Sequence, residues 1–211
     1  MFLVTAVARH PTAFTRSNHV LNSEEKLIHD LAILQEMASQ MDEYLKSETL
    51  FWPMGHSDMP KLTLGGYWLR QHRLTALRHL LTSDQQTQAE TAVHTFETAV
   101  SDWVVRTEQR AHAELAARIR QWDEYLRDLR EKRSENAGSY AAQVEVRAII
   151  AALIDNLQQA PYQLDEKLLQ SILTQDKGLR ARFASGDFVW PEEWQPAYPE
   201  PEYWWLYGRP K

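Results

Sequence analysis

Apolar side chains recur along the middle of this chain with the period of an α-helix. Between Ser83 and Arg133 the inward-facing positions are Val93, Phe96, Val100, Trp103, Thr107, Ala111, Leu115, Ile119, Trp122, Leu126 and Leu129. Their mean spacing is about 3.6 residues, the period of a straight helix, and not the 3.5 residues of a sustained coiled coil. No glycine or proline interrupts the chain from Tyr67 to Ala137. The pattern therefore predicts one helix of about 50 residues.

A helix of that length decides the expected shape of the molecule. At a rise of about 1.5 Å per residue it would reach about 75 Å. A compact protein of this chain length has a radius of gyration of only about 17 Å. We therefore predict an all-α fold, an elongated helical bundle built on the long helix.

Two shorter helices are predicted ahead of the long one, at about 23–46 and about 63–81. Both have apolar residues at helical spacing. Thr63 is suited to cap the second of them. Gly65 and Gly66 follow in its first turn, where glycine lowers helix stability. The pair is therefore expected to allow a close approach of two backbones.

The start of the long helix and two later helices are also marked by local signals. Ser83 and Gln86 have the spacing of a capping box. A turn then separates the long helix from a predicted helix at about 140–159, which a short connection makes its antiparallel neighbour. A shorter helix is predicted at 164–175, ended by Gly178.

One stretch of the long helix is poor in apolar residues. Between Val105 and Leu115 the inward positions are only Thr107 and Ala111, flanked by charged side chains. Because such a stretch buries little, we predict a neck between two packed regions. The expected organisation is an N-terminal arm at 1–21, a proximal helical bundle at 22–106, a distal helical region at 107–186 and an aromatic, proline-rich tail at 187–211.

The C-terminal tail has a composition of its own. Residues 188–211 hold five of the nine prolines and four of the eight tryptophans. Proline at this density opposes helices and central strands and favours extended backbone. Disordered segments are poor in aromatic residues, whereas these rings would hide large areas if they were docked. We predict a tail docked on the long helix, with Glu192, Glu193, Glu200 and Glu202 facing outward.

Composition excludes several classes of function. The 211 residues are 44% apolar and 25% charged, as in a folded protein, and carry a net charge of -6. That charge argues against binding to nucleic acid or to an anionic membrane surface. Cysteine is absent, so disulfides, thiolate nucleophiles and cysteine-ligated metals are excluded. We expect a cytoplasmic protein, since the lack of cysteine fits a reducing compartment.

Membrane and targeting signals are weak. No apolar run approaches the roughly 20 residues of a membrane-spanning helix. The mainly apolar residues 2–8 have no basic residue ahead of them and are followed by Arg9, so they make a poor secretory signal. Whether residues 1–21 form an arm on the body, a targeting segment or an over-extended start is left open.

The stretch Lys61–Leu81 is the strongest candidate for binding, because it is basic and aromatic and contains no acid. Basic groups beside a helix N-terminus can hold an anion. The candidate ligand-binding residues, here and in the preceding loop, are Trp52, His56, Tyr67, Trp68, Arg70, His72, Arg73 and His79. The commoner alternative is that these charges pair with acids on the first helix or on the tail.

Signatures of metal, cofactor and hydrolase chemistry are missing. The Glu-x-x-His spacing of ferritin-like di-iron bundles is absent. His56, His72 and His79 could supply three nitrogen ligands to zinc only if the loop folds back, which nothing local enforces. No nucleophile-elbow, zincin or P-loop motif occurs. Asp187, Glu192 and Glu193 lie in a proline-rich tail that is a poor host for a catalytic carboxylate pair. We predict no catalytic residue, metal or cofactor.

Two functions from different classes are compatible with these patterns. The first is a non-catalytic scaffold or protein–protein interaction protein that self-associates through apolar stripes left uncovered along the long helix. The alternative is a helical protein, conceivably an enzyme, that binds a small or anionic ligand in a basic, aromatic pocket around residues 51–79.

Overall fold

The computed structural model describes residues 23–55, 59–131 and 140–211. The predicted N-terminal arm and His56 lie outside these ranges. The helices are α1 (Ser23–Ser39), α2 (Met41–Lys46), α3 (Leu64–Ala76), α4 (Ser83–Asp102), α5 (Val104–Arg130), α6 (Tyr140–Leu157) and α7 (Glu166–Arg180). Short 3-10 turns are η1 (Arg78–Leu80), η3 (Glu192–Ala197) and η4 (Trp204–Leu206), and two strands are β1 (Phe183–Phe188) and β2 (Tyr207–Pro210). The helical class is confirmed.

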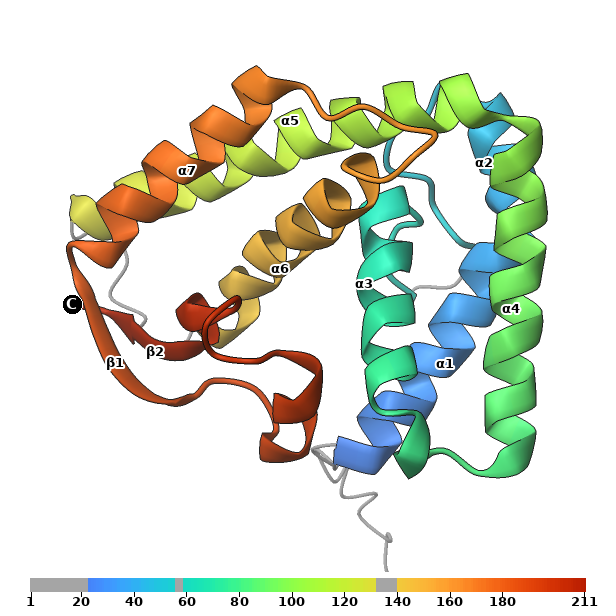
Figure 1. Cartoon of the computed structure of the whole chain (residues 1–211), viewed down its shortest axis with the longest axis horizontal. Helices are drawn as coiled ribbons and strands as arrows, with labels where there is room; N and C mark the ends of the chain where they lie inside the picture. Colours follow the sequence, from blue (N-terminus) through green and yellow to red (C-terminus); the bar gives the residue numbers. More distant parts are fainter. Residues whose placement is uncertain (1–22, 56–58, 132–139) are drawn as a thin grey trace, which may run out of the picture.

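The predicted long helix is two helices that meet at Trp103. Within the described residues the longest helix, α5, has 27 residues, and α4 and α5 run in different directions from a shared corner (Figure 1). Trp103 has φ -127° and ψ 36°, outside the helical region, and its indole N–H donates to Asp42 Oδ1 of α2 at 3.0 Å. The prediction of one helix of about 50 residues is therefore wrong. The apolar period shows which face of a helix is buried, but it does not show whether the helix axis changes direction. One continuous stripe is therefore compatible with two helices that meet at a bend, as α4 and α5 do.

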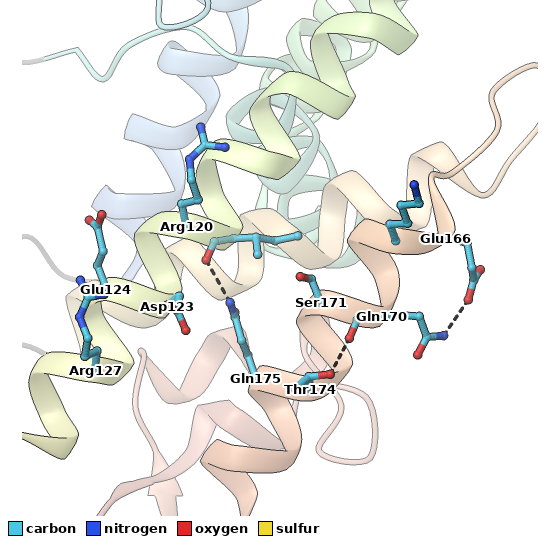
Figure 2. Close-up of a pocket in the computed structure, with 11 residues that line it drawn as sticks. Arg120, Asp123, Glu124, Arg127, Glu166, Gln170, Ser171, Thr174 and Gln175 are labelled. Atoms are coloured by element: carbon cyan, nitrogen blue, oxygen red, sulfur yellow. Dashed lines mark hydrogen bonds between the residues drawn. The ribbon is translucent and has the colours of Figure 1, made fainter.

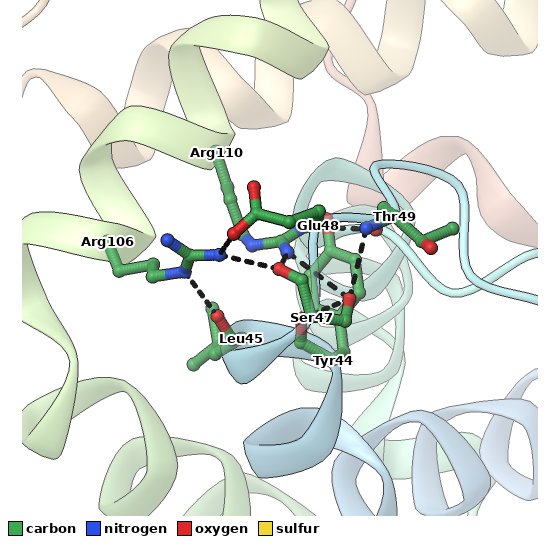
Figure 3. Close-up of polar contacts among 7 residues, drawn as sticks. All are labelled: Tyr44, Leu45, Ser47, Glu48, Thr49, Arg106 and Arg110. Carbon is green, nitrogen blue, oxygen red and sulfur yellow. Dashed lines mark hydrogen bonds and ion pairs between the residues drawn. The ribbon is translucent and has the colours of Figure 1, made fainter.

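The predicted neck is also wrong, because it is a buried polar junction. Thr107, Arg110 and Glu114 are 0%, 7% and 0% exposed. Figure 3 shows Arg106 and Arg110 directed at the C-terminal end of α2. Arg106 Nε donates to Leu45 O at 2.6 Å, and Arg110 Nη1 donates to Thr49 O at 3.0 Å. Carbonyls at a helix end lack partners in their own helix, so arginines can be buried against them.

Buried Glu114 on the same stretch holds the N-terminus of α3. Its Oε2 accepts from Gly65 N at 2.8 Å, and Thr63 Oγ1 accepts from Gly66 N at 3.0 Å. A Cβ on Gly65 would lie 2.7 Å from Ile149 Cγ2 of α6. The Thr63 cap is therefore confirmed. The glycine pair is tightly packed as predicted, but the atoms closest to Gly65 belong to side chains of α6 and not to a second backbone.

Other predicted boundaries shift by a few residues. The first helix is interrupted at Gln40, between α1 and α2. The capping box is formed by Thr82 and Gln85, one residue earlier than the predicted pair. Helix α6 agrees with the prediction to within two residues. Helix α7 continues through Gly178, so that glycine does not end it.

The tail packs against several helices through tryptophan–arginine contacts. The guanidinium carbon of Arg73 (α3) lies 3.9 Å from the Trp194 ring centroid, that of Arg147 (α6) 3.7 Å from Trp205, and that of Arg180 (α7) 4.3 Å from Trp204. Docking on one long helix is thus not confirmed. The four predicted outward glutamates are exposed.

The sequence did not predict the antiparallel pairing of β1 with β2, in which Phe183 lies opposite Pro210. Proline is tolerated there because both strands of a two-stranded sheet are edge strands.

The buried apolar residues of all seven helices and the tail join one hydrophobic cluster. It runs through α1, α3 and α4 on one side and α5, α6 and the tail on the other (Figure 1). The division into proximal bundle, distal region and tail is not tested by this arrangement and stays a prediction.

Candidate functional site

Three of the predicted site residues, Trp52, Tyr67 and His79, do not line a shared pocket in the described part of the chain. Tyr67 is fully buried, with its ring stacked on Phe96 at 3.9 Å between centroids. Trp52 donates its indole N–H to Gln40 Oε1 at 2.9 Å. His79 is exposed on η1.

Arg70 and Arg73 are buried beside one carboxylate of α1. Arg70 Nε lies 3.3 Å from Asp30 Oδ1, and Arg73 Nη1 pairs with Asp30 Oδ2. Arg73 Nε also donates to Tyr198 Oη at 2.9 Å. As the commoner alternative to ligand binding, the sequence allowed that these arginines pair with an acid of the first helix. The structure contains this pairing. Arg73 is therefore enclosed by protein groups.

The same arginines border a hollow of about 450 Å³ that opens between α1, α3 and the tail. Lys26 and His29 of α1 and Glu145 of α6 also line it. Glu145 Oε1 lies 3.9 Å from Arg70 Nη2. Because Asp30 already pairs with both arginines, an incoming anion would compete with a buried carboxylate.

A second hollow, here named the α3–α6 hollow, holds two other predicted residues, Trp68 and His72. Its volume is about 490 Å³, within the usual size range of small-molecule sites. The lining residues are Trp68, Leu69, His72, Ala148, Ala152, Asp155, Asn156, Gln158, Gln159 and Tyr203. Helix α3, helix α6 with the residues that follow it, and the tail thus each contribute a wall.

His72 is oriented in this hollow by the tail. Its Nε2 lies 2.7 Å from Ala197 O of η3, and since a carbonyl only accepts, Nε2 carries the proton and donates. The ring is also 5.9 Å from the Tyr203 ring, between centroids. In the neutral imidazole, Nδ1 is left as an acceptor.

Asp155 and Tyr203 supply two groups without partners. Among the described residues, neither the Asp155 carboxylate nor the Tyr203 hydroxyl has a hydrogen-bond partner; Asp155 is exposed, and the Tyr203 hydroxyl is not one of the buried polar atoms that lack a partner. Reduced hydration inside the hollow raises the pKa of Asp155, and the nearby His72 acts against this rise. Burial also raises the pKa of Tyr203, and Asp155 adds to the effect. The hollow thus holds a carboxylate and a neutral phenol.

A larger groove of about 890 Å³ lies between α5 and α7 and is named the α5–α7 groove (Figure 2). None of its residues was predicted as a site. Several of its polar groups bond to the two helices that form it: Gln170 Nε2 donates to Glu166 Oε1 at 2.7 Å, and Gln175 Nε2 donates to Ile119 O at 3.3 Å. Its charged lining is of mixed sign, with Arg120, Asp123, Glu124 and Arg127 on α5.

Sequence reasoning missed Asp155 and Tyr203. Asp155 lies next to the apolar stripe of α6, and Tyr203 belongs to the tail, which was expected only to cover helices. No local motif marks either residue. Only the fold brings them to His72.

In the described ranges no group of three or more histidine, aspartate or glutamate side chains is placed to hold a metal ion. No helix of the described chain combines the length and apolar content needed to cross a bilayer. Searches against protein-family models, curated proteins and solved structures find no match for this chain.

Proposed function

We propose that this protein binds a small polar ligand in the α3–α6 hollow. The observation that carries the proposal is the convergence of three side chains on one hollow: exposed His72, exposed Asp155 and buried Tyr203. A hollow in which a few polar side chains converge beside aromatic rings is the usual form of a small-molecule site, and the Asp155 carboxylate and the Tyr203 hydroxyl are available to such a ligand.

The other two hollows fit this role less well. In the hollow beside Arg73 the buried arginines already pair with Asp30. In the α5–α7 groove Gln170 and Gln175 bond to their own helix or to the helix opposite. Beside Arg73 a ligand would compete with existing bonds, and in the α5–α7 groove it would meet charges of mixed sign on an open surface, whereas the α3–α6 hollow gathers one carboxylate and two aromatic rings.

Self-association, the first function expected from the sequence, stays a prediction with less support. Its motive was a rod too long for its neighbours to cover, and the bend at Trp103 removes that rod. The exposed large apolar residues of the described chain are Ile28, Leu80, Val105 and Leu173. They lie on different elements, and single exposed apolar residues are normal on monomers. Light scattering at several protein concentrations tests this, and a constant monomer mass would contradict it. A cytoplasmic location, inferred from the lack of cysteine, stays a proposal as well.

A fragment screen that compares the wild type with a variant whose hollow is filled by a larger side chain tests the ligand proposal. Asn156 lines the α3–α6 hollow and is partly exposed, so Asn156→Trp fills space without entering the core. Its matched control is Thr95→Trp on the exposed face of α4, because both native side chains donate to a carbonyl four residues earlier.

We expect fragments that bind the wild type in ligand-observed NMR to bind Thr95→Trp equally and to lose binding to Asn156→Trp. Circular dichroism checks that both variants are folded. Hits that still bind Asn156→Trp, or a wild type that binds no fragment, would overturn the proposal.

A further inference from the structure

We infer, on the basis of the function proposed above, that the ligand of the α3–α6 hollow is an organic cation with a protonated amine that donates hydrogen bonds to Asp155, His72 and Tyr203. The chemical class follows from three features of the lining: its charge, its hydrogen-bonding groups and its rings.

The charge of the lining is negative. Asp155 is its one carboxylate, and the lining contains no lysine or arginine. Arg147 also acts electrostatically on Asp155, but it is paired with Asp176, with Nε to Oδ1 at 2.9 Å and Nη2 to Oδ2 at 2.6 Å. Glu202 adds further negative potential at Asp155. A cation is therefore attracted and an anion is repelled.

Three side chains of the hollow can accept hydrogen bonds from a ligand: Asp155, His72 and Tyr203. The Asp155 carboxylate only accepts, and His72 presents an acceptor at Nδ1 because Nε2 donates to Ala197 O. The Tyr203 hydroxyl can accept as well as donate. A primary ammonium has three N–H donors in a small volume, so one such group can satisfy these acceptors together.

The rings of the hollow suit the same class of ligand. Trp68 and Tyr203 line it from opposite elements, α3 and the tail. Trp68 is held edge-on to Phe96 at 6.1 Å between centroids, and Tyr203 packs against Tyr198 at 5.1 Å, so both rings are fixed by neighbours. Fixed aromatic rings attract cations electrostatically.

The pH dependence of binding follows from Asp155. Its pKa is raised above the ordinary value of 3.8, and only its ionised form attracts an ammonium. Cation affinity is therefore full above the raised pKa and is lost as pH falls through it. The other titratable or charged groups that act on Asp155 are His72, Arg147, Glu202 and Tyr203.

Four matched probes of nearly equal size test the class of ligand by NMR titration: phenethylammonium, its N-trimethylated form, phenethyl alcohol and phenylpropionate. We expect phenethylammonium to bind at least about tenfold more tightly than the alcohol, a difference of about 1.4 kcal/mol. Phenylpropionate should not bind. The trimethylated form should bind more weakly than the primary amine, because it has no N–H to donate.

Variants tie the result to the hollow. Asp155→Asn should lose at least about tenfold in affinity for phenethylammonium, whereas Asp123→Asn in the α5–α7 groove should lose none. Asn156→Trp should abolish binding of every probe.

Several results would overturn the inference: no binding of the primary amine, equal binding of the alcohol or of the trimethylated form, or unchanged affinity in Asp155→Asn. If Asn156→Trp still blocks fragments from a neutral library in any of these cases, the proposed function stands and only the class of ligand is wrong. If Asn156→Trp blocks nothing, the proposed function fails too.

Discussion

The α3–α6 hollow and the α5–α7 groove differ in what their polar groups do. The groove is the larger, at about 890 Å³ against about 490 Å³. It lies between two helices, and Gln170, Gln175 and Thr174 bond within those helices. The hollow has three walls, one of which is the tail, and it leaves Asp155 and Tyr203 without partners among the described residues. Volume alone would select the groove, whereas the combination of one carboxylate, one oriented histidine and two aromatic rings selects the hollow.

The two places also depend differently on the rest of the fold. The groove needs only α5 and α7. The hollow needs the tail to bring Tyr203 and to orient His72, and it needs α3 and α6 at close range through Gly65. Substitutions that release the tail or separate α3 from α6 should therefore damage the hollow and spare the groove.

The largest effect is expected from Arg73→Met, which breaks the connection between α3, α1 and the tail. Arg73 is 5% exposed, pairs with Asp30 and stacks on Trp194. Loss of one partner of a buried ion pair destabilises by about 3 to 5 kcal/mol. Urea denaturation, followed by tryptophan fluorescence, measures this loss in the free energy of unfolding. The control is Arg78→Met, whose exposed pair with Glu90 contributes at most about 1 kcal/mol. Equal effects of the two variants would contradict the role of the buried arginine.

A smaller effect is expected from Gly65→Ala, compared with Gly178→Ala on α7. The new Cβ at Gly65 meets Ile149 at 2.7 Å and Leu153 at 2.8 Å, so α3 and α6 must separate. Overpacking of this kind costs about 1 to 3 kcal/mol. At Gly178 no atom lies within 4 Å, so alanine should stabilise α7 by up to about 1 kcal/mol. Chemical denaturation should show a lower free energy of unfolding for Gly65→Ala and a higher one for Gly178→Ala. An unchanged free energy of unfolding in Gly65→Ala would disprove the tight contact.

The next prediction concerns the pH dependence of stability at Glu114, whose carboxylate binds the N-terminus of α3, the helix that carries His72. Burial raises the pKa of this carboxyl above its ordinary 4.5. The stability that comes from the protonated form is therefore present below pH 4.5 and is lost as pH rises through the raised pKa. Glu114→Gln does not titrate there, so its unfolding free energy relative to wild type should increase as pH rises above 4.5. Urea denaturation across a pH series checks this, and a constant difference would refute it.

The smallest effect on stability is expected from Asp155→Asn in the hollow and Asp123→Asn in the groove. Both should change the unfolding free energy by no more than about 0.5 kcal/mol, because neither acid has a buried partner to lose. The two variants should then differ only in ligand affinity. Thermal denaturation without ligand provides the check, and a large loss of stability in Asp155→Asn would assign that residue a structural role.

Local signals in the sequence predicted the local features well. Helical period placed α6 to within two residues, Thr63 was identified as a cap and Gly65 as a contact point. The cap and the helical period depend on the spacing of residues within one helix, which is the range over which sequence spacing is informative; at Gly65 the sequence marked the position but not its neighbours on α6.

The candidate site was only partly predictable for the same reason. The predicted residues Trp68 and His72 do line the hollow, but the predicted set also includes Tyr67, which is core, and Arg73, which is paired. Spacing on α3 shows which residues are neighbours there. The spacing does not show which residues of α3 form ion pairs with acids on other helices, as Arg73 does with Asp30.

By itself the sequence determined that the chain is helical, which faces are apolar and that an aromatic tail has to be covered. Only the tertiary structure decided that the long stripe bends at Trp103, that the charged stretch around Arg110 and Glu114 is buried, and that His72 bonds to a carbonyl 125 residues away. The physical reason is range: backbone conformation responds to near neighbours, whereas the burial of a charge depends on a partner that only folding brings close.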